Sequence, residues 1–442
     1  MKLIRMLAVG ASVWLAWITT LAATQSRPDL VGRVTDVDDS PVTNATVFIY
    51  TAGPRAGTSS LCPSCYADCS KKARTDTAGR FKVESLDPKL LFRLLVVGAG
   101  HESLFVPKVD PAAGEVKIEL NPLSQEALKS KRRILGMVMS EDGKPVIGAI
   151  ISPEGVDRGT GTQWGGIDKF VDPLAVADEH GHFVLLCQDG ADAVHATVEG
   201  GGAAKRWLEL KPGRDYLIRV QDGVTVTGHV VANGQPIKDA LVGLVTSDRA
   251  CGNCLRYDEV ATDKDGRFIL SNVTPEREFV LYAKMESLGS RGTLPTKTFT
   301  TGKSGATSDL GTLAVQPAHR LAGRVVLSDG KPVPADTRLF LGREGAWDHT
   351  EAVLDADGGF EFNGVPAESI SLSIRIKGYK LSKRNPSLDW LNGMIIGRLT
   401  GDLTDLVLSM EPGEWRFNGE EGDPPVEGDR QPRDQPLRGA KL

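Results

Sequence analysis

The sequence predicts an all-β chain built of four tandem Ig-like β-sandwich domains. One observation is an internal pattern that occurs four times, the usual mark of a repeat architecture. A second is the composition, because 49 glycines, 25 prolines and only 6% aromatic residues suit short strands joined by turns. A third is the length, because 442 residues exceed one hydrophobic core, while 40% hydrophobic residues suffice for several.

Residues 1–23 have the pattern of a signal peptide. Lys2 and Arg5 precede an apolar run over 6–21, and small residues follow at 22–24, where a signal peptidase could cut. The run is shorter than the roughly 20 residues that a membrane span needs, although an uncleaved signal anchor remains the alternative. We therefore expect a secreted, periplasmic or cell-surface protein.

Each repeat opens with a glycine inside a short apolar segment, followed eight or nine residues later by proline and a branched aliphatic residue. A polar turn separates the two marks, and an alternating apolar run follows the proline, so the local prediction is strand, tight turn, strand. The openings are Val31-Gly32-Arg33-Val34, Leu135-Gly136-Met137-Val138, Thr227-Gly228-His229-Val230 and Ala322-Gly323-Arg324-Val325.

A second mark in every repeat is an Asp-x-x-Gly-x-Phe turn. The aspartate can cap its own backbone, the glycine accepts a positive φ, and the phenylalanine begins an inward-facing series with a period of two. The four turns are Asp76 to Phe81, Asp178 to Phe183, Asp263 to Phe268 and Asp355 to Phe360.

A further strand follows these turns, as at 92–97, 279–283 and 370–376. The domain prediction is therefore sandwich 1 over 29–122, sandwich 2 over 131–221, sandwich 3 over 222–316 and sandwich 4 over 319–411. Residues 124–131 form a possible helical linker turn, and short linkers favour a semi-rigid rod. The tail over 418–442 is nearly devoid of apolar residues and is predicted to be disordered.

The combined pattern resembles the carboxypeptidase regulatory-like domain, a transthyretin-like (prealbumin-like) β-sandwich. The residues that carry the resemblance are the Gly-x-Val opening, the Pro-Val turn, the Asp-x-x-Gly-x-Phe turn and Gly378-Tyr379 in the last repeat. It covers nearly all of 29–411, but repeat 2 departs from it at a glycine-rich insertion over 154–172 and an interruption over 199–204. The resemblance implies a fold and an accessory, non-catalytic role, and names no substrate.

No arrangement of residues points to catalysis, so we expect a non-enzyme without catalytic residues, metal or cofactor. His180 and His182 share a spacing that could bind a metal, but both lie in an Asp turn and are interpreted as exposed turn residues. The Asp-x-Asp-Gly steps at 263 and 355 lack the later ligands of a calcium loop. A formal charge of −5 without a basic stripe argues against nucleic-acid binding.

The six cysteines are the most informative candidate site. In an exported protein, Cys-x-x-Cys steps before the Asp turns of repeats 1 and 3 favour disulfides that staple a loop. One account joins Cys251 to Cys254, Cys69 to Cys62 or Cys65, and the remaining thiol of that pair to Cys187. A metal site and a redox pair are the alternatives.

The leading functional hypothesis is a surface scaffold that contacts a protein or polysaccharide through the loops 52–74, 154–172 and 245–258. The alternative is an accessory component of a peptidase or redox system that uses the Cys-x-x-Cys loops. The membrane would be involved only through an uncleaved signal anchor. The tryptophans could stack on sugars, but single tryptophans in separate repeats are more often core or edge residues; they are Trp164, Trp207, Trp347, Trp390 and Trp415.

Overall fold

The computed structural model describes residues 27–55, 63–64, 66, 68–69, 71–130, 132–164, 166–248, 254–385, 388–389, 393–413 and 437. The predicted signal peptide lies outside these residues. The predicted disordered tail is represented by Leu437, whose backbone N donates to Arg398 O at 2.9 Å. Leu437 is buried against the core of the fourth unit, so at this residue the structure differs from the expected disorder.

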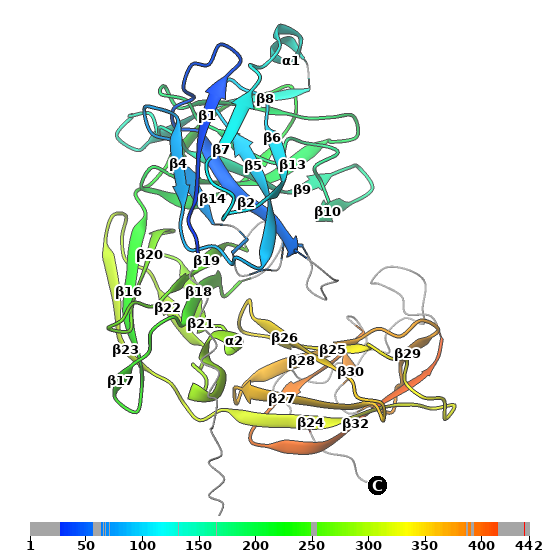
Figure 1. Ribbon diagram of the computed structural model, residues 1–442. Helices are drawn as coiled ribbons and strands as arrows, with labels where there is room; N and C mark the ends of the chain where they lie inside the picture. The colour runs from blue at the N-terminus through cyan, green and yellow to red at the C-terminus, as the bar shows by residue number, and fades with distance from the viewer. Residues whose placement is uncertain are drawn as a thin grey trace, which may run out of the picture.

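The described residues are nearly all β, and they form four successive sandwiches of two sheets each (Figure 1). This confirms the predicted fold class. Unit 1 pairs the sheet β4-β1-β7 with β3-β2-β5-β6. Its strands are β1 (Leu30–Asp36), β2 (Thr46–Pro54), β3 (Lys72–Arg74), β4 (Arg80–Val83), β5 (Leu90–Val97), β6 (Leu104–Val109) and β7 (Val116–Leu120).

Unit 2 pairs the sheet β12-β8-β15 with β10-β9-β13-β14, whose strand β9 also pairs with β11. Its strands are β8 (Arg133–Ser140), β9 (Ile150–Asp157), β10 (Thr162–Trp164), β11 (Ala175–Val176), β12 (His182–Leu186), β13 (Ala193–Gly200), β14 (Ala203–Leu210) and β15 (Asp215–Val220).

Unit 3 pairs the sheet β17-β16-β20, with β23 on β16, against β19-β18-β21-β22. Its strands are β16 (Val224–Ala232), β17 (Gln235–Pro236), β18 (Leu241–Thr246), β19 (Arg256–Ala261), β20 (Arg267–Val273), β21 (Glu278–Ala283), β22 (Lys297–Thr300) and β23 (Thr307–Ala314).

Unit 4 pairs the sheet β27-β24-β32-β29 with β26-β25-β28-β31-β30. Its strands are β24 (His319–Leu327), β25 (Arg338–Arg343), β26 (His349–Val353), β27 (Gly359–Val365), β28 (Ser369–Ile374), β29 (Tyr379–Leu381), β30 (Leu388–Asp389), β31 (Met394–Arg398) and β32 (Leu403–Pro412).

The first strand of every unit pairs antiparallel with the strand after the Asp turn and parallel with the last strand. This register explains why the two repeated marks occur together. In each unit the opening glycine lies directly opposite the phenylalanine of the Asp turn. A Cβ on Gly136 would meet the ring of Phe183 at 2.2 Å, so the glycine leaves the space that the ring occupies.

The Asp turns are built as the sequence predicts. Asp178 Oδ1 accepts hydrogen bonds from the backbone N–H groups of His180 at 2.9 Å and His182 at 2.8 Å, and Gly181 has φ 81°. The aspartates of the other three units cap the same two positions of their own turns. These carboxylates therefore serve the turn itself.

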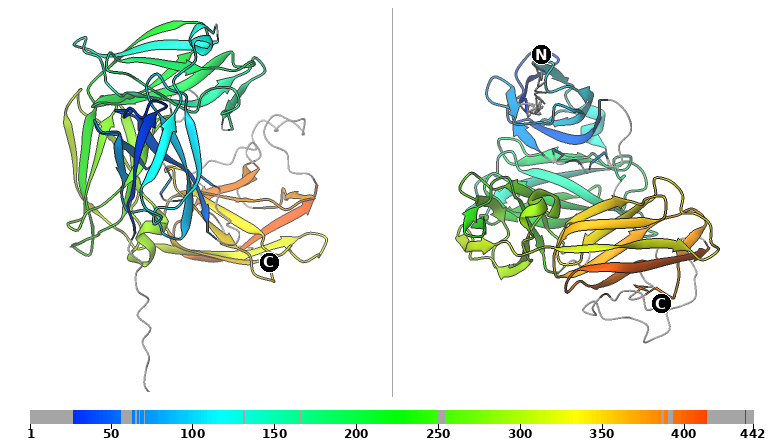
Figure 2. Two further views of the ribbon diagram at one scale, coloured as in Figure 1. Left: turned by 45° about the horizontal axis from the view of Figure 1, so that its top comes forward. Right: turned by 60° about the horizontal axis from the view of Figure 1, so that its bottom comes forward.

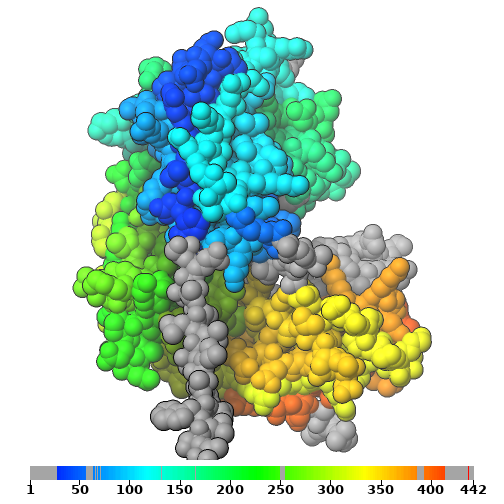
Figure 3. Space-filling model, viewed as in Figure 1, coloured from blue at the N-terminus to red at the C-terminus, as the bar shows by residue number. Residues whose placement is uncertain are grey.

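The units pack against one another and do not form the expected rod (Figures 1 and 2). An apolar cluster joins Leu95 and Val97 of unit 1 to Ile150 and Val176 of unit 2, with Tyr50 packed beside it. A rod would leave these side chains in water, so their burial favours the folded-back arrangement. Figure 3 shows units 1 to 3 as one block from which unit 4, in yellow and orange, projects.

Unit 2 departs from the repeat where the sequence predicts it, but with more order than expected. Part of the glycine-rich insertion forms the hairpin β9–β10, with Trp164 opposite Gly155. The interruption is a tight turn between β13 and β14, in which Gly200, Gly201 and Gly202 all have positive φ. Both features lengthen the sheet that faces unit 1 and unit 3.

The described helices are short. α1 (Gln125–Lys129) is the predicted linker turn, and Ser124 Oγ accepts from Ala127 N at its N-terminus. α2 (Met285–Leu288) and η1 (Gly289–Arg291) follow β21 and were not predicted. Met285 of α2 belongs to the core of unit 4, so this helix reaches from unit 3 into its neighbour.

Candidate functional site

The described cysteines carry free thiols, and the predicted disulfides stay a prediction because each needs a cysteine outside the described residues. Cys69, Cys187 and Cys254 are unpaired, while the predicted partners Cys62, Cys65 and Cys251 lie outside the described residues. Cys187 is buried in the core of unit 2, and burial raises the pKa of its thiol to about 12. Burial likewise raises the pKa of Cys69 to about 11. Thiols of this kind behave as small apolar core residues.

His180 and His182 lie on the exposed Asp turn of unit 2, as interpreted from the sequence. Their ring centroids are 6.2 Å apart, but across the described ranges no group of three histidine, cysteine, aspartate or glutamate side chains is placed to hold a metal ion. Nor does any helix in the described part of the chain combine the length and apolar character of a membrane span.

A cavity of about 350 Å³, lined by both charged and apolar side chains, lies where units 1, 2 and 3 meet. Strands β2 and β3 of unit 1, the β13 end of unit 2 and strands β19 and β20 of unit 3 line it. Clefts between domains are common places for ligands, so this is a candidate binding site. The lining residues are Thr46, Lys72, Ala73, Arg74, Ile150, Glu199, Gly200, Gly201, Tyr257, Asp258, Val260, Leu270, Ser271 and Asn272.

Glu199 is the central charge of this cavity. Its carboxylate lies 2.6 Å from Lys72 Nζ of unit 1 and 3.3 Å from Lys205 Nζ of its own unit. Burial alone would raise the pKa of Glu199, but the two ammonium groups outweigh it and hold the pKa at about 2. Arg74 adds a second link by donating to the backbone oxygen of Gly148 in unit 2.

Lys205 and its neighbours tie unit 2 to unit 3. Lys205 Nζ donates to Arg256 O at 3.0 Å, and Thr274 Oγ1 donates to Lys205 O at 2.6 Å. Tyr257 Oη is 3.0 Å from Thr274 Oγ1. The cavity wall is thus a hydrogen-bonded network that spans three units.

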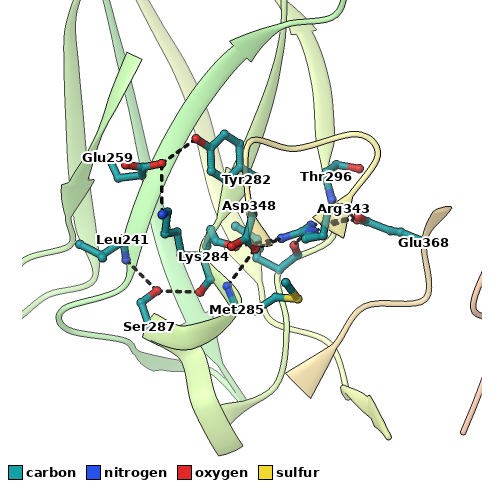
Figure 4. A network of polar contacts seen from close by, with 12 residues as sticks. Leu241, Glu259, Tyr282, Lys284, Met285, Ser287, Thr296, Arg343, Asp348 and Glu368 are labelled. Carbon is teal, nitrogen blue, oxygen red and sulfur yellow. Dashed lines mark hydrogen bonds and ion pairs between the residues drawn. The ribbon is translucent and has the colours of Figure 1, made fainter. Parts of the chain in front are cut away.

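Arg343 is the centre of a second junction, between units 3 and 4 (Figure 4). Its side chain is 0% exposed and lies 3.3 Å from Asp348 and 3.0 Å from Glu368. Its guanidinium also donates to Ala283 O at 2.9 Å and Leu294 O at 3.0 Å, both in unit 3. A planar guanidinium with five donors suits such a multi-partner buried position.

The carboxylates of this junction also bind the backbone of unit 3. Asp348 Oδ2 accepts from Met285 N at 3.0 Å, and Glu368 Oε1 accepts from Thr296 N. Burial raises the pKa of Asp348, although the Arg343 charge opposes that shift. Arg343, Asp348 and Glu368 therefore each contact a backbone group of unit 3. Separating the units would expose these charges and break the hydrogen bonds.

A buried tyrosine continues the network on unit 3, where Tyr282 Oη donates to Glu259 at 2.8 Å (Figure 4). Burial raises the pKa of Tyr282, and the Glu259 charge adds to the shift. Val245, Val280 and Ala346 form the apolar side of the same junction.

Two of the candidate tryptophans are not isolated, which corrects the prediction. Trp164 and Trp207 both belong to unit 2, and their ring centroids lie 6.0 Å apart. Trp347 is an exposed residue of unit 4 near Arg256, whereas Trp390 and Trp415 lie outside the described residues.

No family model matches the chain, and no curated protein matches it. The Bacillus anthracis TIE protein is a similar solved structure, at 11% identity and TM-score 0.19, over 88% of this chain and 76% of its own. A Streptococcal ancillary pilin is similar over 64% of this chain and 99% of its own, at 10% identity and TM-score 0.23. A minor pilin of Streptococcus agalactiae is similar over 45% of this chain and 99% of its own, at 11% identity and TM-score 0.24. The assignment as a β-sandwich repeat protein rests on the chain's own sheets.

Proposed function

We propose that this chain is a secreted or cell-surface, non-catalytic scaffold of carboxypeptidase regulatory-like modules that contacts a protein or polysaccharide. The observation that carries the proposal is the pair of ionic junctions between units, one partly exposed at Glu199 and one buried at Arg343. They fasten the units to one another through Glu199 and Arg343, so loops from different units keep fixed positions. A rigid array of loops lowers the entropy lost on binding an extended partner.

The accessory redox role receives less support. Burial raises the pKa of the Cys69 and Cys187 thiols to about 11 and about 12, and reactive thiols need the opposite shift. Of the Cys251–Cys254 pair, only Cys254 lies within the described residues.

Binding of the mature chain to envelope preparations of its host tests the proposal. Labelled protein is incubated with intact envelopes, with protease-treated envelopes and with envelopes stripped of polysaccharide. The scaffold proposal expects saturable binding that is lost with one of the two treatments. Retention of the chain inside the cytoplasm, or equal background binding to all three preparations, would contradict it.

A further inference from the structure

The outward face of the unit 2 sheet carries a cluster of three aromatic rings at the edge of the junction with unit 3, where Trp207 also packs against the apolar core of that unit. Trp164 comes from β10, His195 from β13 and Trp207 from β14. The ring centroids of Trp164 and His195 are 5.4 Å apart, and those of His195 and Trp207 are 6.1 Å apart. The interplanar angle is 30° between Trp164 and His195, 40° between Trp164 and Trp207, and 28° between His195 and Trp207. The rings are thus only moderately tilted against one another. We call Trp164, His195 and Trp207 the aromatic platform.

The register of the sheet places these rings side by side. Trp164 and His195 both lie opposite Gly155, from either side of β9. A Cβ on Gly155 would come within 2.6 Å of Trp164 Cε3, so the missing side chain lets the indole lie against the strand. Trp164 is nevertheless 50% exposed, and the other two rings are partly exposed.

We propose that the aromatic platform binds a neutral saccharide by stacking of a pyranose ring. The C–H groups of a pyranose face carry partial positive charge, and the aromatic face carries the complementary negative charge of its quadrupole. The proposal rests on the proposed scaffold function and gives it a partner class and a place.

The surroundings favour an uncharged, hydroxyl-rich ligand. Glu209 is exposed and lies opposite His195, and Glu154 is exposed and accepts from Thr197, the residue opposite Trp207. These carboxylates can accept hydrogen bonds from sugar hydroxyls. The charges of Lys205 and Arg256 act on Glu154 and partly balance it, so the site has no strong preference for a charged ligand. Lys211 lies 3.5 Å from Glu209 and partly balances its charge.

The size of the platform argues against a second protein. An aromatic side chain buries about 150–250 Å² when fully covered, so three partly covered rings offer roughly 200–300 Å². A stable protein interface needs about 800 Å² from each partner, more than this surface supplies. One or two sugar rings match the available area.

Binding to an array of neutral and acidic glycans, followed by calorimetry with the best-bound oligosaccharide, tests the proposal on the full mature chain. Trp164→Ala removes the most exposed ring and should weaken binding by about 10- to 100-fold. Gly155→Ala keeps every ring but displaces the indole, and should also weaken binding. Trp164→Phe retains a ring and should bind between wild type and Trp164→Ala.

Trp347→Ala is the matched control, because Trp347 is 44% exposed and lies in another unit. It should bind like wild type. The proposal is overturned if no glycan binds in a Trp164-dependent way, or if Trp164→Ala and Trp347→Ala behave alike. It is also overturned if sedimentation shows that Trp164→Ala abolishes self-association of the chain instead. Because the assay uses purified protein, its failure leaves the envelope-binding test of the scaffold function independent.

Discussion

Replacing Arg343 by alanine tests the junction between units 3 and 4. The substitution leaves Asp348, 1% exposed, and Glu368, 14% exposed, without their buried cation. It also removes the donors to Ala283 O and Leu294 O. Breaking a buried ion pair by removing one partner costs about 3–5 kcal/mol, because the remaining charge stays buried without compensation.

That loss should be visible in calorimetry of the full chain. For a cooperative block of the size of units 3 and 4, each kcal/mol lowers Tm by about 2–4 °C, so the transition should fall by roughly 6–20 °C. Arg343→Lys keeps the positive charge but loses the planar guanidinium, so its Tm should lie between those of the wild type and Arg343→Ala.

Arg320→Ala is the matched control within unit 4. Arg320 pairs with Glu361, but the two side chains are 49% and 44% exposed. Water screens exposed ion pairs, which therefore contribute little to stability, so this variant should melt close to wild type. If Arg343→Ala lowers the transition by no more than Arg320→Ala does, the reasoning about the buried junction is refuted.

Three other predictions concern the first junction, the repeat and the thiols. Glu199→Gln should destabilise the chain at pH 7, but the difference from wild type should vanish as pH falls from about 4.5 to about 2. The folded pKa of Glu199 is lowered to about 2, so its contribution is complete above the unfolded value and is lost on acidification; denaturant titrations from pH 2 to 7 check this. Gly136→Ala should cost about 1–3 kcal/mol by overpacking against Phe183, whereas Gly53→Ala, with no atom within 4 Å, should be nearly neutral in the same unfolding assay. Cys187 should resist thiol reagents in the native chain but react fully in denaturant without reductant, as mass spectrometry of labelled peptides would show.

Each of these predictions has a contradicting result. A pH-independent effect of Glu199→Gln would mean that its charge does not hold the junction. Equal stability of Gly136→Ala and Gly53→Ala would remove the explanation of the repeated glycine. Failure of Cys187 to react in denaturant until reductant is added would restore the disulfide predicted from the sequence.

The repeat could be predicted because its marks are local. The Asp turn needs a capping carboxylate and a glycine within four residues, and both can be read directly from Asp178 and Gly181. The pairing of Gly136 with Phe183 was not predicted, although both residues were identified, because register depends on strands 47 residues apart in sequence. The short helix α2 escaped prediction because its Met285 is stabilised by the core of another unit.

The junctions could not be predicted from motifs, because their partners come from different units. One local signal was nevertheless present at Arg343. Leu339 and Leu341 precede Arg343 at a spacing of two residues. In a β-strand these three side chains point to the same, buried face of the sheet. A charge at such a position indicates a buried ion pair, but its partners Asp348 and Glu368 follow from tertiary packing. The contact between Trp164 and Trp207 likewise could not be predicted, because the two residues are far apart in sequence and only the pairing of the strands brings their rings together.

Hydrogen exchange of the amides of Met285 and Thr296 tests most directly whether the units form one rigid scaffold. These amides belong to unit 3 but donate to Asp348 and Glu368 of unit 4. If the junction is permanent, both should exchange as slowly as the amides in the sheets of unit 4, and Arg343→Ala should accelerate them. If they exchange as fast as exposed loop amides in the wild-type chain, the units move independently and the account of a rigid scaffold is wrong.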